Sequence, residues 1–345
     1  MAVWMVRAGR NGEREDFAIE NNVAVIGWNT MPDLSKVKSR EEMKALQAEK
    51  YPQQKEKAVF NYAGQVWSFA HRIEVGDIIV LPFKTRSAIA LGKCTGKYEY
   101  VPENPDEAKH VRKVKWIRVD VPRDEFGQDL LYTLGAFMTV CRVQRNNAED
   151  RIAAILKGGR DPHLTGGSIS GKKPLEDEPS DEGEPPLDLE RYASDQIRAV
   201  IGAKFSGHAL SRLVTSLLKA QGYQTFMAPP GADGGSDILA GRGPMGFDLP
   251  RLCVQVKSGA TPVDVSILRE LQGVMKNFGA EQGLLVSWSG FKESVYREAK
   301  TLFFELRLWD SDRLVQSLLE HYDQLPDEIQ AELPLKRIWT LVPEE

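Results

Sequence analysis

Hydrophobic positions in the first 157 residues form short runs rich in Val and Ile, which is typical of β-strands. The expected strands are Val3–Arg7, Val23–Gly27, Asp77–Pro82, Ala88–Thr95 and Lys113–Val119. Two other segments repeat their apolar residues every three to four positions and therefore predict helices, Glu41–Lys50 and Glu56–His71. We expect a β-rich N-terminal domain with a few helices.

From about residue 190 the pattern changes to helices that alternate with short apolar strands. Leu210–Gln221 predicts an amphipathic helix, which ends at Gly222. Strands are expected at Gln224–Met227, Asp237–Ala240, Arg251–Lys257, Gly283–Ser287 and Phe304–Trp309. Further helices are expected at Val263–Phe278, Lys292–Thr301 and Asp312–Tyr322. This alternation predicts an α/β domain built around a mixed sheet.

The segment 158–190 separates the two patterns. It is rich in Gly, Pro and Ser, and it holds three basic and nine acidic residues, a net charge of −6. Such a composition predicts a flexible, self-repelling linker. We therefore expect a first domain at 1–157, a second at 191–324, and an apolar tail at 325–345 that packs on a neighbouring surface.

The composition fits a folded protein of two domains. The chain has 345 residues, of which 42% are hydrophobic and 27% charged, and this excludes a disordered chain. No apolar run approaches the roughly 18–20 residues of a membrane span, and the N-terminus lacks the layout of a secretory signal. The three cysteines show neither metal-ligand spacing nor a disulfide framework. We expect a cytoplasmic protein without a membrane partner.

The net charge of −4 does not argue against a nucleic-acid partner. Outside segment 158–190 the chain carries 42 basic and 40 acidic residues, a net charge of +2. Binding to DNA depends on a local basic face rather than on the total charge.

A group of polar residues lies on a predicted hairpin in the second domain. Asp237 stands at the start of one strand, and Gln255 and Lys257 stand at the end of the next. Residues 255 and 257 are two apart on a strand, so their side chains point to the same face. Val254 and Val256 then point into the core. The hairpin brings Asp237 close to the other two polar side chains.

These residue types suit phosphodiester hydrolysis. That reaction uses a divalent cation to neutralise the phosphate and to activate a water. Mg²⁺ prefers oxygen ligands, such as a carboxylate or an amide carbonyl. We predict that Asp237 and Gln255 hold Mg²⁺, or Mn²⁺ in its place, and that Lys257 orients the water and offsets charge in the transition state.

Several short motifs, in order along residues 205–320, carry a family resemblance. They are Asp-Gly-Gly-Ser-Asp at 233–237, Val-Gln-Val-Lys at 254–257, the helix around Gly273, and Leu-Val-Ser-Trp-Ser-Gly-Phe at 285–291. Together they resemble the Mrr-type restriction endonuclease domain, the QxK branch of the PD-(D/E)xK nucleases. The resemblance implies an α/β nuclease domain with a mixed sheet. It places the three catalytic positions on Asp237, Gln255 and Lys257.

The sequence departs from this family at the first helix. Mrr-like domains usually carry an acidic residue there, and the equivalent position is Ser211. His208 lies one helical turn earlier and is a candidate ligand or general acid/base. The alternative is that His208 only precedes the helix and binds nothing. Asp233 can supply the missing charge, although its position between glycines is typical of a turn residue.

The first domain resembles the PUA-like barrels that include the EVE domains. The residues behind this resemblance are Val-Ile-Gly-Trp at 25–28 and Val-Gly-Asp-Ile-Ile-Val at 75–80. The resemblance implies nucleic-acid binding, in some members with a flipped base in an aromatic pocket. A flipped base needs an aromatic surface for stacking and polar groups that read its edge. The candidate residues for contacts to a base or to phosphates are Trp28, Asn29, Lys84 and Arg86.

Together these features predict an Mg²⁺-dependent DNA endonuclease of a modification-dependent, type IV-like restriction system. Its expected partners are double-stranded DNA, including DNA with modified bases, and a second copy of the chain. One alternative is a non-catalytic nucleic-acid reader on an inactive nuclease fold. The other is a structure-selective nuclease.

Overall fold

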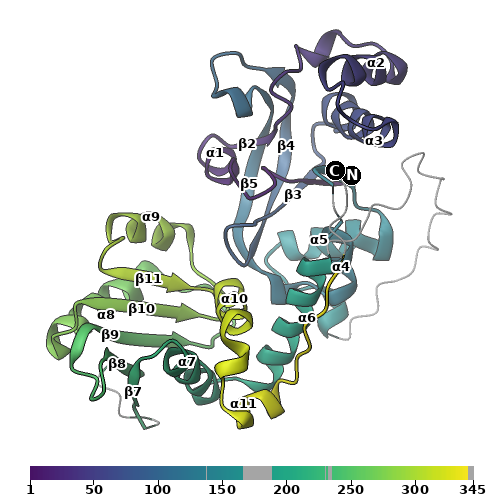
Figure 1. The fold of residues 1–345 in the computed structure, drawn as a ribbon. Coiled ribbons are helices and arrows are strands. Elements are labelled where there is room, and N and C mark those ends of the chain that lie inside the picture. The colour runs from purple at the N-terminus through teal and green to yellow at the C-terminus, as the bar shows by residue number, and fades with distance from the viewer. Residues whose placement is uncertain (137, 166–188, 230, 232–234, 341–345) are drawn as a thin grey trace. The chain divides into compact units, whose positions relative to one another are not determined.

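The computed structural model describes residues 1–136, 138–165, 189–229, 231 and 235–340. The chain forms two compact units, Met1–Tyr192 and Ala193–Thr340. Each unit contains one mixed β-sheet with its own covering helices (Figure 1). The predicted fold class, an α/β domain after a β-rich domain with helices, is confirmed.

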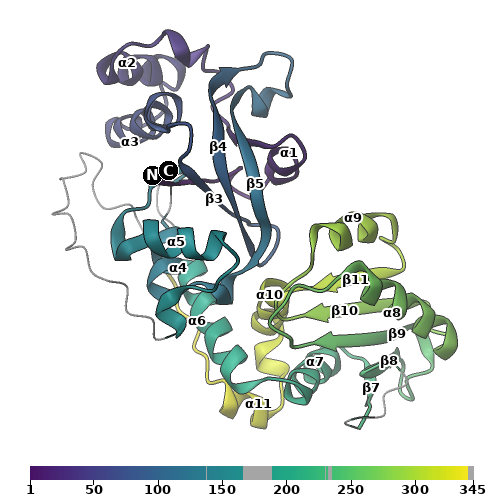
Figure 2. The ribbon, with the colours of Figure 1, turned by 180° about the vertical axis from the view of Figure 1, so that it is seen from behind.

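The N-terminal unit is built on a six-stranded sheet of order β2-β5-β4-β3-β1-β6. Its strands are β1 (Val3–Val6), β2 (Val23–Ile26), β3 (Ile78–Pro82), β4 (Ala88–Tyr100), β5 (His110–Pro122) and β6 (Val140–Arg142). The pair β1–β3 is parallel, and the other neighbours are antiparallel. Strands β4 and β5 form a long antiparallel ribbon (Figure 2). The predicted strands lie within one residue of β1–β3, whereas β4 and β5 extend further than expected.

Helices cover this sheet on both faces. They are α1 (Glu15–Glu20), α2 (Arg40–Lys50), α3 (Glu56–Trp67), α4 (Gln128–Leu134) and α5 (Ala148–Leu156). Helices α4 and α5 pack with β1 and β3 in one core, which includes Met5 and Leu130. Single helical turns complete the unit: the 3₁₀ segments η1 (Leu34–Lys36), η3 (Asp106–Ala108), η4 (Arg123–Glu125), η5 (Arg145–Asn147) and η6 (Pro162–Thr165), and the π-helical segment η2 (Ser68–Arg72).

The start of the predicted linker belongs to this unit. The Asp161 side chain is fully buried and accepts hydrogen bonds from Gly127 N at 2.8 Å and from Arg151 Nε at 2.9 Å. Arg151 is also fully buried, so the ion pair fixes the chain after α5. The local sequence gives no sign of this pairing across ten residues. The domain boundaries at 157 and 191 stay a prediction. Residues 166–188 lie outside the described part of the chain.

The C-terminal unit has a five-stranded sheet of order β11-β10-β9-β8-β7. Its strands are β7 (Gln224–Met227), β8 (Ile238–Arg242), β9 (Asp248–Lys257), β10 (Gln282–Ser287) and β11 (Leu306–Trp309). The strands β7, β8 and β9 pair antiparallel, and β9, β10 and β11 pair parallel. The predicted hairpin between Asp237 and Lys257 is therefore the β8–β9 pair.

Helices form a layer on each face of this second sheet. They are α6 (Leu189–Lys204), α7 (His208–Ala220), α8 (Val265–Phe278), α9 (Glu293–Thr301), α10 (Ser311–His321) and α11 (Asp327–Glu332), with η7 (Tyr322–Gln324) between the last two. Buried residues of α6, α7, α10 and α11 form one core with the sheet, and those of α8 and α9 form the other. Asp264 begins α8 by accepting from Ser266 N, and Gly279 ends it with a positive φ of 63°.

The predicted C-terminal tail joins this unit in its first part. Ile329 and Leu333 are buried in the core with α7, and Leu335 packs against it. Ile338 and Trp339 further along are exposed.

Candidate functional site

The Asp237 carboxylate ends the backbone ladder between β8 and β9. The Asp237 backbone N–H donates to Val254 O at 2.9 Å. Its side-chain Oδ2 accepts from the Val256 backbone N–H at 2.7 Å. The carboxylate thus occupies the place where the next backbone acceptor would lie. These two bonds hold Asp237 against the stretch of β9 that carries Gln255.

Gln255 is buried beside this carboxylate. Val254 and Val256 pack in the core with α7, whereas Cys253 packs in the core with α8 and α9. Side chains alternate along a strand, so Gln255 and Lys257 face the α8 side. Only 7% of Gln255 is exposed, and its Oε1 has no hydrogen-bond partner among the residues that the structure describes. An orphaned buried acceptor costs about 1–3 kcal/mol, so this oxygen is suited to a ligand that would satisfy it.

Two hydrogen bonds fix the chain at Lys257 and at the next residue. Its carbonyl accepts from Trp288 N at 2.9 Å, at the end of the parallel pair β9–β10. The next residue, Ser258, accepts through Oγ from Gly207 N at 3.0 Å, immediately before α7. Lys257 itself is partly exposed. Its ammonium group therefore projects from a fixed point on the sheet to a position that solvent reaches.

The loop before Asp237 approaches α8 closely. Gly235 has φ of +90°, a conformation that side-chain-bearing residues rarely adopt. A Cβ atom at this position would lie 2.7 Å from Cγ2 of Val274 on α8. Only glycine fits here without a shift of the loop. Gly235 is therefore one of the features that set the position of Asp237.

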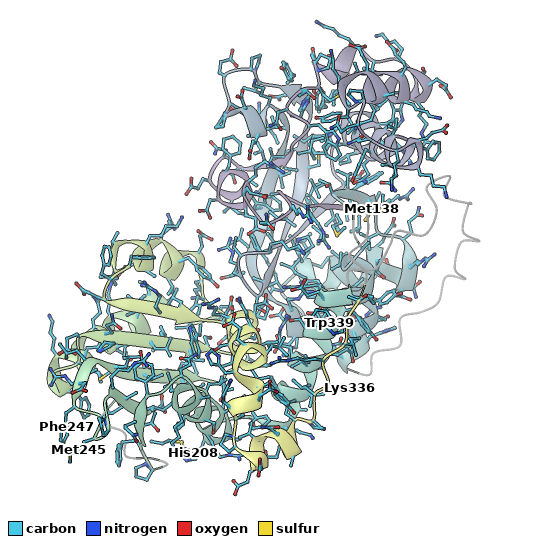
Figure 3. All side chains as sticks on the ribbon, viewed as in Figure 1. Met138, His208, Met245, Phe247, Lys336 and Trp339 are labelled. Carbon is cyan, nitrogen blue, oxygen red and sulfur yellow. The ribbon has the colours of Figure 1, made fainter. Side chains whose placement is uncertain are left out.

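Helix α7 lies on the other face of the sheet from Gln255. His208 is its first residue and is exposed (Figure 3), and Ser211 is buried with the helix. The structure records no contact between His208 and either Asp237 or Gln255 among the described residues. The role of His208 at the site stays a prediction: His208 follows Gly207, whose N–H donates to Ser258 Oγ next to Lys257. Asp233 lies outside the described residues.

The donor set fits a hard divalent cation. Asp237 offers a carboxylate, and Gln255 offers the unsatisfied amide oxygen. In the described chain, no group of three or more His, Cys, Asp or Glu side chains is arranged so that it could hold a metal ion. A cation bound here would therefore take much of its coordination from waters and from phosphate oxygens, as Mg²⁺ commonly does.

A second candidate site is a pocket in the N-terminal unit. It has a volume of about 420 Å³. Its aromatic lining consists of Trp28, Tyr51 and Tyr62, and its cationic lining of Arg7, Arg10, Arg14 and Lys84. Asn29, Thr30, Gln65, Met138 and Thr139 also contribute, and the carboxylates of Asp and Glu are absent from the lining. The sequence-predicted residues Trp28, Asn29 and Lys84 thus come together here.

Trp28 is held in a rare backbone conformation. Its φ is +61°, and its carbonyl accepts from Met31 N at 2.9 Å to close a turn directly after β2. A bulky residue at positive φ is a genuine outlier, and such strain gathers at ligand clamps. The Trp28 and Tyr62 rings meet edge-on, with centroids 6.0 Å apart at 68°. Together they form an aromatic corner in the pocket.

Two polar side chains, the buried His110 and the partly buried Tyr98, lie next to this aromatic corner. His110 Nδ1 and the Tyr98 hydroxyl lie 2.8 Å apart, and the hydroxyl accepts from Leu34 N. Burial lowers the pKa of His110 to about 4, although the carbonyls of Trp28 and Met31 favour its protonated form. At neutral pH the ring is therefore uncharged.

The floor of the pocket is fixed by a buried carboxamide. Gln65 is 1% exposed, and its Oε1 accepts from Thr139 N at 2.7 Å and from Val140 N at 3.0 Å. Its Nε2 donates to Asn61 at 2.5 Å. Helix α3 is thereby tied to the start of β6, close to the pocket residue Met138 (Figure 3).

Arg86 does not join the pocket, although the sequence grouped it with Lys84. It is 6% exposed, and its guanidinium lies 3.8 Å from the ring centre of Phe83. Such stacking on an aromatic face is a common use of arginine inside a fold. The sequence missed Tyr51, Tyr62, Arg7 and Arg14 as pocket residues. Tyr51 and Tyr62 reach the pocket from the end of α2 and from α3, whereas Arg7 follows β1 and Arg14 precedes α1.

Two family models match separate segments of the chain, one in each unit. Residues 203–318 match the model of the restriction endonuclease family Mrr_cat. Residues 4–132 match a domain of unknown function, DUF8426. The PUA-like or EVE-like assignment of the first domain stays a prediction. No curated protein matches the chain.

Three solved structures are similar to this one. The protein of unknown function AF1548 is 17% identical over 31% of this chain and 64% of its own, with a TM-score of 0.26. The DNA modification-dependent restriction endonuclease AspBHI is 14% identical over 80% of this chain and 72% of its own, with a TM-score of 0.34. The MspJI restriction endonuclease, in complex with a 27-mer oligonucleotide, is 12% identical over 96% of this chain and 71% of its own, with a TM-score of 0.32. These likenesses are too weak to assign a function.

In the described part of the chain, no helix combines the length and the apolar character that crossing a membrane requires.

Proposed function

We propose that this protein is a metal-dependent DNA endonuclease that cuts DNA after recognising a modified base. The observation that carries the proposal is the orphaned Gln255 oxygen beside the Asp237 carboxylate, on the hairpin of a restriction endonuclease domain. A buried acceptor without a partner is costly unless a ligand satisfies it. The ligand that suits a carboxylate and an amide oxygen together is Mg²⁺, with Mn²⁺ as its substitute.

In this proposal each residue has a separate role. A cation bound by Asp237 and Gln255 supplies charge neutralisation at the phosphate and a more acidic water. Lys257 donates a hydrogen bond toward the attacking water or the phosphate, and its charge offsets the charge that develops in the transition state. The bond from Val256 N orients the Asp237 carboxylate.

The N-terminal unit would recognise the DNA. A flipped base needs an aromatic surface and polar groups at its edge, and Trp28 and Asn29 offer both in one pocket. Arg10 and Lys84, on the lining of the same pocket, suit the flanking phosphates. This is the arrangement expected of a PUA-like reader. The protein would act on cytoplasmic duplex DNA as part of a type IV-like restriction system.

Cutting both strands with one active site per chain requires two protomers, so we infer that a homodimer forms at least on DNA. This part rests on the chemistry of double-strand cleavage.

A second candidate function is a non-catalytic reader on an inactive nuclease fold. The observation that favours it is Ser211, which stands where the family has an acid. Without that acid, the described residues contain no group of three or more His, Cys, Asp or Glu side chains that could hold a metal ion.

A cleavage assay with matched substrates separates these functions. Duplexes of one sequence would carry unmodified, methylated or hydroxymethylated bases, in the presence of Mg²⁺, Mn²⁺ or chelator. The proposal expects cleavage of a modified duplex that chelator abolishes. Binding of that duplex without cleavage under any metal would favour the inactive reader. Preferential cleavage of branched DNA would favour a structure-selective nuclease.

A further inference from the structure

The two long strands of the N-terminal sheet, β4 and β5, share a face with four exposed lysines. We refer to this set as the lysine face; its members are Lys93 and Lys97 on β4, and Lys113 and Lys115 on β5 (Figure 2 shows the two strands side by side). The residues next to them, such as Cys94 and Val114, are buried and point to the opposite face of the sheet. The lysine face is therefore an outer surface of the ribbon.

Two of these lysines stand directly opposite each other. Lys93 on β4 is the cross-strand partner of Lys115 on β5. Side chains in such a position have Cβ atoms about 4.5–5.5 Å apart, and like charges there destabilise a sheet. Neither ammonium group has an ion pair or a hydrogen bond with any described residue. The pair therefore has a free-energy cost that the described part of the fold does not offset.

Carboxylates neutralise only a small part of the lysine face. Glu99 on β4 pairs with Lys113 at 3.2 Å, so four lysines and one glutamate give a net charge of +3. Glu20 and Glu74 are exposed near the starts of β2 and β3, but no ion pair among the described residues joins them to the lysine face. Three of the four lysines are thus available to an anionic ligand.

Protection of a sheet edge does not explain these lysines. Proteins often place lysine on an edge strand, where it prevents pairing with another chain. Strands β4 and β5 instead lie inside the six-stranded sheet, between β3 and β2. Binding of an anion gives the charges a reason that the position of the strands does not.

The lysine face is long enough for a chain of phosphates. Residues 93 and 97 are four apart on β4, which is up to roughly 13 Å along an extended strand. One strand of duplex DNA has a phosphate about every 3.4 Å along the helix axis. A small anion would meet one end of this row of lysines, whereas a DNA backbone can meet all of it.

We propose that the lysine face binds the sugar-phosphate backbone of the duplex that the N-terminal unit recognises. This inference rests on the proposed function and adds the surface on which the DNA lies. Phosphate contacts carry no sequence information, so the lysine face fixes the position of the duplex and leaves recognition of the base to other residues.

The test measures binding of duplex DNA by the full chain at a series of salt concentrations. EDTA removes the cation that cleavage requires. The variant combines Lys93→Gln with Lys115→Gln. Each lost phosphate contact lowers the slope of log Kd against log salt concentration by about 0.9, so the slope should fall by roughly 2. At low salt, binding should weaken at least tenfold, and by the same factor for modified and unmodified duplexes.

A matched control removes two lysines elsewhere in the same unit. Lys57 on α3 and Lys157 after α5 are exposed and have no ion pair among the described residues. Lys57→Gln combined with Lys157→Gln changes the net charge equally and should leave the slope as in the wild-type protein. The variant at 93 and 115 also loses a like-charge repulsion, so it should unfold at an equal or higher denaturant concentration than wild type.

A wild-type slope in the variant at 93 and 115 overturns the inference, while a continued preference for the modified duplex leaves the proposed recognition function in place. Weaker binding of the modified duplex alone also overturns the inference, because a backbone contact acts on both duplexes. Weaker binding together with a lower unfolding midpoint assigns the lysines a structural role and overturns it as well. Absence of DNA binding by the wild-type protein would overturn the proposed function itself.

Discussion

Trp28 combines a strained backbone with a position over a buried histidine. Its carbonyl and that of Met31 lie toward His110, whose ring also meets the Tyr98 hydroxyl. The uncharged His110 ring is buried beside this turn, and its Nε2 has no hydrogen-bond partner among the described residues. Asp33 and Lys109 act on the ring with opposite sign, and the effect of burial exceeds both. The protonation state of His110 depends on pH, and with it the stability of the N-terminal unit.

Stability of the N-terminal unit should fall as pH drops from about 6.5 toward 4. The unfolded His110 binds a proton near pH 6.5, whereas the folded one resists protonation until about pH 4. The unfolded state therefore gains protons first, and the folded state loses on the order of 2–3 kcal/mol across this window. Chemical denaturation at a series of pH values measures the free energy of unfolding.

The matched variant is His110→Gln, which does not titrate in this range. Because carboxylates also titrate toward pH 4, the prediction concerns the difference between the two proteins. The variant should show a shallower loss of stability between pH 6.5 and 4. The same pH dependence in both proteins would contradict the assigned role of His110.

At the scale of elements, the β8–β9 hairpin and α8 together position the Asp237 carboxylate. The hairpin supplies Asp237 and Gln255, and α8 limits the loop before them through Val274. A side chain at Gly235 would therefore meet α8.

Gly235→Ala should reduce cleavage much more than it reduces DNA binding. The new methyl group would clash with Val274, and φ of +90° disfavours alanine. A displacement near 1 Å of a reacting group can cost about 100-fold in rate. We expect kcat to fall roughly 10- to 100-fold, as measured in single-turnover cleavage. Binding is measured in parallel with the uncut duplex.

Gly273→Ala is the control within the same region. Gly273 lies on α8 with open space around the site of a new Cβ, so alanine there should keep wild-type cleavage. Wild-type cleavage by the Gly235→Ala variant would show that this close approach does not set the position of Asp237.

Local sequence predicted the elements that have strong periodicity, and missed the short ones. The strands around the catalytic hairpin and the helices α7, α8, α9 and α10 were predicted to within about three residues, because their apolar repeats are clear. Helices α1, α4, α5 and α11 were not predicted, since they are short and tertiary contacts stabilise them. The longer helix α6 was not predicted either, and its start lies in the segment predicted as linker.

The sequence predicts site residues that a local connection brings together, and misses those that only tertiary packing brings together. Asp237 and Gln255 meet through a hairpin, which is a local connection that the sequence expresses. The relation of His208 to the sheet depends on how α7 packs, and the grouping of Tyr51 and Tyr62 with Trp28 depends on α2 and α3. Neither packing arrangement leaves a periodic signal in the sequence.

At the scale of the whole molecule, each unit has its own buried core. Leu130 belongs to a core of the first unit and Leu213 to a core of the second, and both side chains are fully buried. Separate cores predict separate unfolding transitions, because the cooperativity of unfolding comes from shared packing.

Calorimetry should therefore resolve two transitions that respond to different substitutions. Leu213→Ala leaves a cavity that costs about 2–5 kcal/mol, so one transition should fall by roughly 10 °C. Leu130→Ala should lower the other transition by a similar amount. A single transition, or a shift of both transitions by one substitution, would contradict independent units.

The central claim is that the hairpin residues form a metal-dependent catalytic site, and single-turnover cleavage by Lys257→Ala and Asp237→Asn tests it most directly. The substrate is the duplex that the wild-type protein cuts with Mg²⁺, and its binding by each variant is measured beside the rate. The account predicts that cleavage falls at least 100-fold in both variants, since each loses charge stabilisation in the transition state, while binding stays within a few-fold. Cleavage at the wild-type rate by both variants, with equal protein purity and fold, would contradict it.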